Sequence, residues 1–241
     1  MFISPISKTI LDKGHKFSYP FPFTYIDNFL NNDSLPLIID EVQQLKNENG
    51  NMNFTNILDL NQYNKYTFNN FNKNSSLNKL FEELCSDEFI THIEKCTGIT
   101  DLIRNDTTLF GAGVHRITKG GLLNIHTDFN VFQSDKHGII DRRINLLIYL
   151  NDNWKEEYKG DLLLCDKNTK IICYKIMPIL NRCVIFNTTN SSLHGHPEPL
   201  MGPIRESIAV YYYTKNKYNG VCDFENDIPH TTIFYNTNEF K

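Results

Sequence analysis

The second half of the chain is divided into short apolar runs, and this pattern restricts the fold more than any other feature. Turn residues separate most of the runs, as in Lys119-Gly120-Gly121 and Asn151-Asp152-Asn153. Short β-like segments separated by turns are typical of an all-β sandwich or double-sheet jelly roll. The eight runs are 109–117, 122–126, 144–150, 161–165, 171–176, 183–186, 192–194 and 204–213.

The first hundred residues have a different character. Residues 21–30 alternate and are rich in aromatic side chains, which predicts a strand, and polar residues that could cap a helix precede an amphipathic stretch at 35–46. Residues 47–74 are rich in Asn and predict an irregular segment. Residues 75–97 return to helical spacing as two short helices, with Gly98 placed to end the second.

We therefore expect a mainly β protein with N-terminal helices (α+β) and a core that is a double-stranded β-helix, or cupin-like jelly roll. Residues 1–105 would form an N-terminal strand and helical support region, residues 106–215 the core, and residues 216–241 a C-terminal extension packed on it. A chain of 241 residues can bury a sizeable core as one unit.

Charge and cysteine usage limit the partners and the compartment. A net charge of -4 and a pI near 6.1 give no basic surface for nucleic acid or anionic membranes. Residues 1–16 lack a continuous apolar core, and no stretch approaches the roughly 20 apolar residues of a membrane span. The cysteines form no C-x-x-C pair, which favours reduced thiols and a cytoplasmic location. They are residues 85, 96, 165, 173, 183 and 222.

The pair His126-x-Asp128 is the first candidate for chemistry. Residues two apart on an extended segment project to the same side, so both could bind one metal ion. Two imidazoles and one carboxylate on one face of an octahedral ion leave three positions open, an arrangement typical of non-haem Fe(II) oxygenases. Zinc more often takes a tetrahedral site. With 8 His and 28 acidic residues, about one such pair is expected by chance.

Two histidines compete for the third metal position. His194 and His196 both lie in the run Ser192-Leu-His-Gly-His-Pro. Pro197 disfavours regular strand pairing of the residue before it, so His194 is the better candidate ligand. His196 would then line the pocket without binding the metal.

A carboxylate-binding arginine is the third feature. Arg205 and Ser207 alternate on one apolar strand and therefore project to the same side. A guanidinium can hold a carboxylate through two parallel hydrogen bonds, and a hydroxyl can add a third. Tyr149, in the run 145–151, could reach the same carboxylate, although a buried core tyrosine is the plainer interpretation.

Taken in order, these stretches resemble the 2-oxoglutarate and Fe(II)-dependent dioxygenases, specifically their prolyl-4-hydroxylase-like branch. The resemblance covers residues 109–214, nearly the whole predicted β core. The matching stretches are Gly120-Gly121-x4-His126-Thr-Asp128, Ile148-Tyr149-Leu150-Asn151-x2-Trp154, Gly160-Asp-Leu, Arg182-Cys-Val-Ile-Phe186, His194-Gly-His-Pro and Arg205-Glu-Ser207-Ile-Ala.

The resemblance implies His126, Asp128 and His194 as iron ligands. Arg205 would hold the far carboxylate of 2-oxoglutarate, with Ser207 and Tyr149 as helpers. The family often has a tyrosine on the strand before the His-x-Asp pair, whereas this chain has His115-Arg116-Ile117. That end of the cosubstrate site therefore departs from the family's pattern. The N-terminal helices would support the larger sheet, as in this branch.

The implied activity is hydroxylation of a C–H bond with Fe(II), 2-oxoglutarate and O2, supported by ascorbate. We expect a prolyl residue in a protein or a proline-like molecule as substrate. The alternatives are another small molecule or a glycan precursor. Asp128 argues against a halogenase, where a small residue leaves room for chloride.

Two further classes differ in how they would use the site. A non-catalytic jelly-roll binding module needs no iron. A cupin-like metal isomerase has no need for Arg205-x-Ser207. Substrate specificity in such folds lies in loops, and the lid candidates are residues 47–74 and 131–143. The substrate and the oligomeric state stay open at this stage.

Overall fold

The computed structural model describes residues 1–47, 51–53, 61–108, 111–215 and 229–241. Leu109 and Cys222, which entered the predictions, lie outside these residues. The α-helices are α1 (Pro5–Leu11), α2 (Leu35–Gln43), α3 (Ser76–Leu84) and α4 (Asp87–Thr97). Two short 3-10 helices are η2 (Glu156–Tyr158) and η3 (Thr237–Glu239). None of the helices among the described residues is long and apolar enough to cross a membrane.

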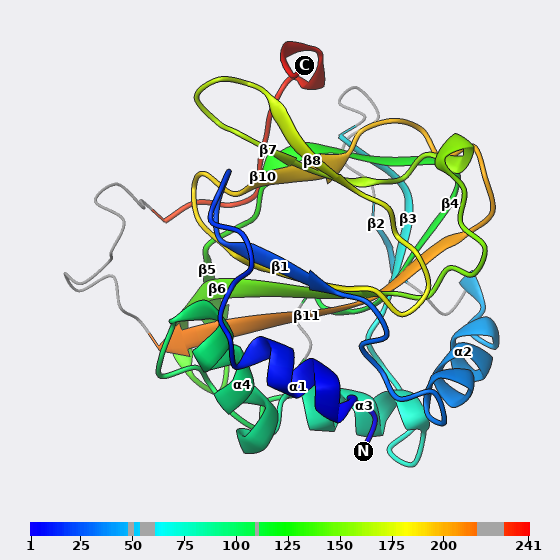
Figure 1. Cartoon of the computed structure of the whole chain (residues 1–241), viewed down its shortest axis with the longest axis vertical. Coiled ribbons are helices and arrows are strands. Elements are labelled where there is room, and N and C mark those ends of the chain that lie inside the picture. The colour runs from blue at the N-terminus through cyan, green and yellow to red at the C-terminus, as the bar shows by residue number, and fades with distance from the viewer. Residues whose placement is uncertain (48–50, 54–60, 109–110, 216–228) are drawn as a thin grey trace.

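The strands form one curled, antiparallel sheet that folds into two layers, a jelly-roll-like arrangement (Figure 1). Its main order is β1-β9-β6-β11-β4-β10-β7-β8, and β2, β3, β5 and β12 pair at its margins. The fold prediction is thus confirmed. The strands are β1 (Phe23–Ile26), β2 (Asn51–Asn53), β3 (Gln62–Phe68), β4 (Gly113–Thr127), β5 (Val131–Ser134), β6 (Gly138–Tyr149), β7 (Leu162–Cys165), β8 (Ile172–Ile176), β9 (Cys183–Asn187), β10 (Leu193–His196), β11 (Arg205–Lys215) and β12 (Ile233–Phe234).

Strand β4 connects the two layers. Its first part pairs with β11, where Ile117 lies opposite Arg205, and its second part pairs with β10, where His126 lies opposite His194. The turn predicted at residues 119–121 is wrong, because the chain continues as one strand through this corner. Only glycine fits at Gly121, since a Cβ there would lie 2.5 Å from the Ile117 side chain and 2.9 Å from the Tyr63 carbonyl oxygen.

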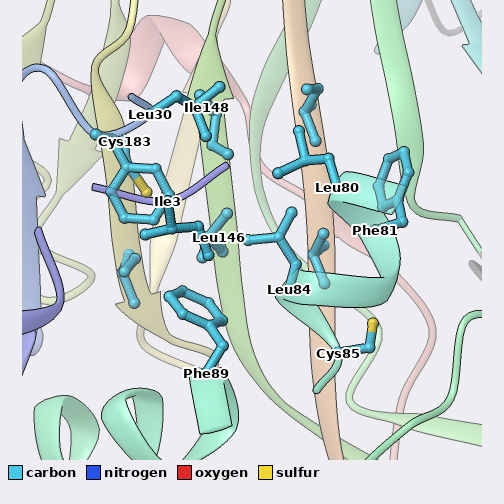
Figure 2. Close-up of a cluster of buried hydrophobic side chains, with 14 of the residues drawn as sticks. Ile3, Leu30, Leu80, Phe81, Leu84, Cys85, Phe89, Leu146, Ile148 and Cys183 are labelled. Atoms are coloured by element: carbon cyan, nitrogen blue, oxygen red, sulfur yellow. The ribbon is translucent and has the colours of Figure 1, made fainter. Parts of the chain in front are cut away.

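The largest apolar cluster lies between the helices and the outer face of the sheet. Leu80, Leu84 and Phe89 from α3 and α4 share one cluster with Leu146 and Ile148 of β6, and Figure 2 shows these side chains between the helices and the strands. Full burial of each leucine contributes about 1.5–3 kcal/mol to folding. The N-terminal region therefore stabilises the larger layer of the sheet from outside, and the opposite face of that layer is left for other contacts.

Strand alternation divides the side chains of β6 and β11 between those two faces. Leu146 and Ile148 face the helices, whereas Tyr149 packs between the layers with Phe23 of β1 and Leu164 of β7. On β11, the apolar Ile208 joins the helix-side cluster. Its neighbour Ser207 lines the interior together with Arg205, so these two polar side chains of the strand lie inside the curled sheet.

The helical predictions agree closely with the structure. Gly98 ends α4 in the left-handed conformation at φ 71, as its position indicated. The hydroxyls of Ser75 and Ser86 accept backbone hydrogen bonds at the starts of α3 and α4. The helix α1 was not predicted; Ser4 caps it and a proline occupies its first turn.

The two lid candidates contain strands of the sheet. Residues 131–143 form β5, a turn and the start of β6, so this part of the chain is a hairpin on the sheet. Within 47–74, residues 62–68 form β3, which pairs with β4, while 48–50 and 54–60 lie outside the described residues. The predicted domain division stays a prediction; the sheet takes strands from all three predicted parts.

Candidate active site

Strand register brings His126 and His194 side by side. They are direct partners on β4 and β10, and their ring centroids lie 4.4 Å apart. Asp128, two residues beyond His126, completes a cluster in which one ligand atom from each residue lies within 4.8 Å of the others. All three side chains are buried. Two imidazoles and one carboxylate converging in this way form a donor set that fits an octahedral Fe(II) ion with open positions.

The orientation of each imidazole is set by the backbone. His126 Nδ1 lies 2.8 Å from the Asn124 carbonyl oxygen, and His194 Nδ1 lies 2.8 Å from the Ser192 carbonyl oxygen. A carbonyl accepts only from a protonated nitrogen, so in the neutral rings both protons lie on Nδ1. Both Nε2 atoms then direct a free lone pair toward Asp128, at 3.6 and 3.4 Å from its carboxylate.

The Asp128 carboxylate is held by two buried side chains. Asn145 donates to Oδ2 at 2.7 Å, and Arg142 approaches the same oxygen at 3.0 Å. Arg142 also donates twice to the Asn145 side-chain oxygen, at 3.0 and 2.6 Å. The three residues therefore form a closed network that fixes the carboxylate plane, and Oδ1 is the oxygen left toward His126.

The electrostatic setting favours metal-binding protonation states. Burial opposes ionisation of Asp128, but the Arg142 guanidinium and the neighbouring imidazoles outweigh it and hold the pKa of this carboxyl well below its usual range. Burial, together with His126, lowers the pKa of His194 to about 4. Near neutral pH the cluster thus offers an ionised carboxylate and a neutral His194 imidazole, which are the forms that bind metal.

A cavity of about 70 Å³ leads from this cluster to Arg205. The Arg205 side chain is 4% exposed, donates from Nε to the Gly160 carbonyl oxygen at 2.8 Å, and contacts the Tyr149 hydroxyl from Nη2 at 3.4 Å. Gly160 has φ 81, which favours glycine, and a Cβ there would lie 3.1 Å from Arg205 Cδ, so a larger residue would also press on the Arg205 side chain. Within the described chain Nη1 has no hydrogen-bond partner, so the guanidinium retains capacity for an anion.

The other predicted residues lie around that guanidinium. Ser207 lines the cavity and is the strand partner of Tyr149. Tyr149 is fully buried in the core between the layers, and its ring lies 4.9 Å from the Arg205 guanidinium carbon. Tyr149 is therefore placed to support Arg205, and it does not line the cavity.

His196 lines the same cavity and is 4% exposed, yet neither ring nitrogen has a hydrogen-bond partner among the described residues. Burial and the nearby Arg205 and Lys65 cations lower its pKa well below the usual range, so the ring is neutral. Two buried, unsatisfied nitrogens indicate a site that takes a polar ligand. Together with Arg205, they fit an anionic cosubstrate such as 2-oxoglutarate.

A wider cavity of about 500 Å³ opens over the cluster from outside the sheet. Its lining includes His126 and Asp128, the polar Gln62, Lys65 and Thr67 of β3, and the aromatic Phe129, Tyr211 and Phe234. Lys65 lines both this outer cavity and the inner one. The site therefore has an inner chamber that ends at Arg205 and an outer chamber that can admit a second molecule.

Sequence reasoning missed Arg142, Asn145 and Lys65. Arg142 and Asn145 could have been noticed as polar residues facing the interior at the start of an apolar strand. Arg142 is the only residue of the predicted lid segment 131–143 that lines these two cavities. Lys65 had no signal, because only the pairing of β3 with β4 brings it to the site.

Comparisons with known proteins agree with this geometry. Residues 112–213 match the model of the 2OG-Fe(II) oxygenase superfamily. No curated protein sequence matches the chain. The matched residues contain the His126–Asp128–His194 cluster and Arg205, so the match and the site occupy the same part of the fold.

Several solved structures share the fold at low sequence identity. A Trichoplax adhaerens prolyl hydroxylase, in complex with a hypoxia inducible factor peptide fragment, is 17% identical with TM-score 0.62, covering 91% of this chain and 95% of that one. A Pseudomonas putida prolyl-4-hydroxylase is 14% identical with TM-score 0.60, covering 87% and 99%. Streptomyces hygroscopicus HygX, with nickel, 2-oxoglutarate and hygromycin B bound, is 11% identical with TM-score 0.53, covering 95% and 98%.

Proposed function

We propose that this chain, whose residues 112–213 match the model of the 2OG-Fe(II) oxygenase superfamily, hydroxylates a C–H bond of a prolyl residue in a protein or of a proline-like molecule. The observation that carries the proposal is the pairing of the His–Asp–His cluster with Arg205 at opposite ends of one inner cavity. The likeness of the fold to two prolyl hydroxylases supports the choice of substrate class.

The enzyme uses Fe(II), 2-oxoglutarate and O2. In our proposal His126, Asp128 and His194 hold the iron, and Arg205 with Ser207 holds the far carboxylate of 2-oxoglutarate. When bound, the iron and 2-oxoglutarate supply the oxidation: O2 gives one oxygen atom to succinate and one to the substrate C–H bond, and carbon dioxide leaves.

The chain's own residues bind, orient and exclude water. Asn145 and Arg142 keep the Asp128 carboxylate in one orientation, and the backbone carbonyls keep both imidazoles in the metal-binding tautomer. Tyr149 supports the Arg205 guanidinium from the core. The buried walls of the inner cavity limit water near the metal, which strengthens each of these electrostatic contacts.

The test is turnover with defined substrates. Purified protein is incubated with Fe(II), ascorbate, 2-oxoglutarate and prolyl peptides or free proline, and succinate and a mass gain of one oxygen are measured. Asp128→Ala should abolish both, since it removes one metal ligand. A protein that produces no succinate above background with any substrate, while binding iron and 2-oxoglutarate, would contradict the proposal.

Hydroxylation of a non-peptide small molecule is a second candidate. It is favoured by the likeness of the fold to HygX with hygromycin B bound. Polar side chains of β3 line the outer cavity and would suit a hydroxyl-rich substrate. The same incubation with aminoglycosides and sugars separates the candidates, because oxygen would enter only the accepted class.

A further inference from the structure

Lys65 is placed at the junction of the two cavities by an irregularity in β3. The pairing of β3 with β4 shifts register between Tyr63 and Lys65, at Asn64, whose φ is 51. Because of this shift, Gln62, Lys65 and Thr67 project from the same face of β3, and all three line the outer cavity. The Asn64 side chain donates to the Lys119 carbonyl oxygen at 3.0 Å, which anchors the bulge.

The Lys65 ammonium has no ion-pair partner among the described residues. The nearest acidic group at the site is Asp128, and its Oδ2 is already bound to Asn145 and Arg142. Asp128 also belongs to the metal cluster, so its remaining oxygen is required there. A cation in a partly buried cavity without a counter-charge is costly, and a ligand that brings a negative charge would offset this cost.

The other charges of the loaded site leave no anion for Lys65. One carboxylate of 2-oxoglutarate would meet Arg205, and the other would meet the iron ion, while Asp128 would be shared between the iron and Arg142. Arg142 is held by Asp128 and Asn145, so Lys65 is the cation of the site that has no bound partner among the described residues. It faces the chamber in which the substrate would lie.

We propose that Lys65 binds a carboxylate of the substrate and so selects acidic substrates. The inference rests on the proposed function and names the substrate class of that same site. The carboxylate can belong to a free amino acid or to an acidic residue beside a prolyl residue in a peptide. Phe129, Tyr211 and Phe234 line the same outer cavity and supply apolar surface for the ring or chain that carries the carboxylate.

The experiment measures binding and needs no turnover. Protein loaded with Zn²⁺ in place of iron and saturated with 2-oxoglutarate is titrated calorimetrically with two matched pairs. The first pair is L-proline and L-prolinamide, and the second is an acetylated Pro-Glu amide and its Pro-Gln counterpart. Lys65→Met is compared with Lys119→Met, which removes the same charge from an exposed position of β4 outside both cavities.

In the unchanged protein, at least one carboxylate ligand should bind at least tenfold more tightly than its amide partner. The pair that responds tells whether the carboxylate comes from an amino acid or a peptide. Lys65→Met should lose this preference and keep its affinity for 2-oxoglutarate within about threefold, while Lys119→Met keeps both. A normal thermal unfolding midpoint for Lys65→Met excludes misfolding as the reason.

Four results overturn the inference. Equal binding of carboxylate and amide partners, or no binding of any carboxylate ligand, removes the preference itself. A preference that survives in Lys65→Met assigns it to another group. A loss of 2-oxoglutarate affinity in Lys65→Met assigns the lysine to the cosubstrate. Failure of the proposed hydroxylation would be seen separately, as missing succinate in the iron-loaded protein.

Discussion

The replacement of Asn145 by Ala tests whether the network behind the metal cluster controls metal affinity. Asn145 is 2% exposed; its amide donates to Asp128 Oδ2 at 2.7 Å and its oxygen accepts from Arg142. The substitution removes the amide and leaves the carboxylate with one partner. Asp128 can then rotate about its side-chain bonds, and metal binding must restore its orientation.

The magnitude follows from the kind of hydrogen bond lost. A buried hydrogen bond to a charged group contributes about 1.5–3 kcal/mol. Arg142 remains 3.0 Å from the same oxygen, so part of the orientation survives and the lower end of that range applies. We expect metal affinity to fall about tenfold, which corresponds to about 1.4 kcal/mol and agrees with the usual effect of residues that orient metal ligands.

The assay is anaerobic titration of the metal-free protein with Fe(II) or Mn²⁺, followed by calorimetry. Asn187→Ala is the matched control: Asn187 is also a buried strand residue, and its side-chain oxygen lies 2.9 Å from His15 Nε2, away from the cluster. Both variants should lower the free energy of unfolding, but only Asn145→Ala should lower metal affinity. Equal metal affinities for Asn145→Ala and the unchanged protein would refute the reasoning.

Three further predictions concern the cosubstrate, protonation and the thiols. Arg205→Lys should weaken 2-oxoglutarate binding about 10- to 100-fold and leave metal affinity unchanged, because an ammonium cannot make the paired hydrogen bonds of a guanidinium; calorimetric titration checks both. Burial lowers the pKa of Lys65 from 10.5 to about 8, so below pH 8 the charged lysine destabilises the folded protein by about 3 kcal/mol. This cost disappears as pH rises from 8 to 10.5, because the lysine loses its proton in the folded protein first. Metal-free Lys65→Met should therefore be more stable than the unchanged protein at pH 8, and the difference in unfolding free energy should close by pH 10.5; a constant difference in denaturant titrations would contradict the prediction. At pH 8 iodoacetamide should modify the partly exposed Cys173 before the buried Cys85, Cys96 and Cys165, because burial raises the pKa of these three thiols to about 12. Peptide mass mapping over time gives the order of modification.

Much of the site could be predicted because its residues lie on strands whose alternation is local. His126 and Asp128 share a face because they are two apart on β4, and Arg205 and Ser207 share a face on β11 for the same reason. Proline after His196 favoured His194, and the register places His194 opposite His126. These relations involve residues that are close in the sequence, so the sequence pattern alone can predict them.

The corner in β4 and the hairpin at 131–143 could not be predicted in the same way. Gly120 and Gly121 suit a turn as well as a bend in a continuous strand, and only the partners β11 and β10 on either side decide between them. The residues before Ile144 extend as strand because β5 and β11 supply their hydrogen bonds. Sheet pairing is a long-range property, so local composition leaves such segments ambiguous.

The sequence by itself determined the β class of the core, the helices that cover one face, and the side chains that meet at the metal cluster and at Arg205. Only the tertiary structure decided what surrounds them. Asn145 and Arg142 hold Asp128 because β6 folds beside the end of β4, and Lys65 reaches the site because a bulge in β3 turns it inward. Alternation along a strand is a short-range consequence of backbone geometry, whereas the neighbours of a buried charge depend on which distant strands pair.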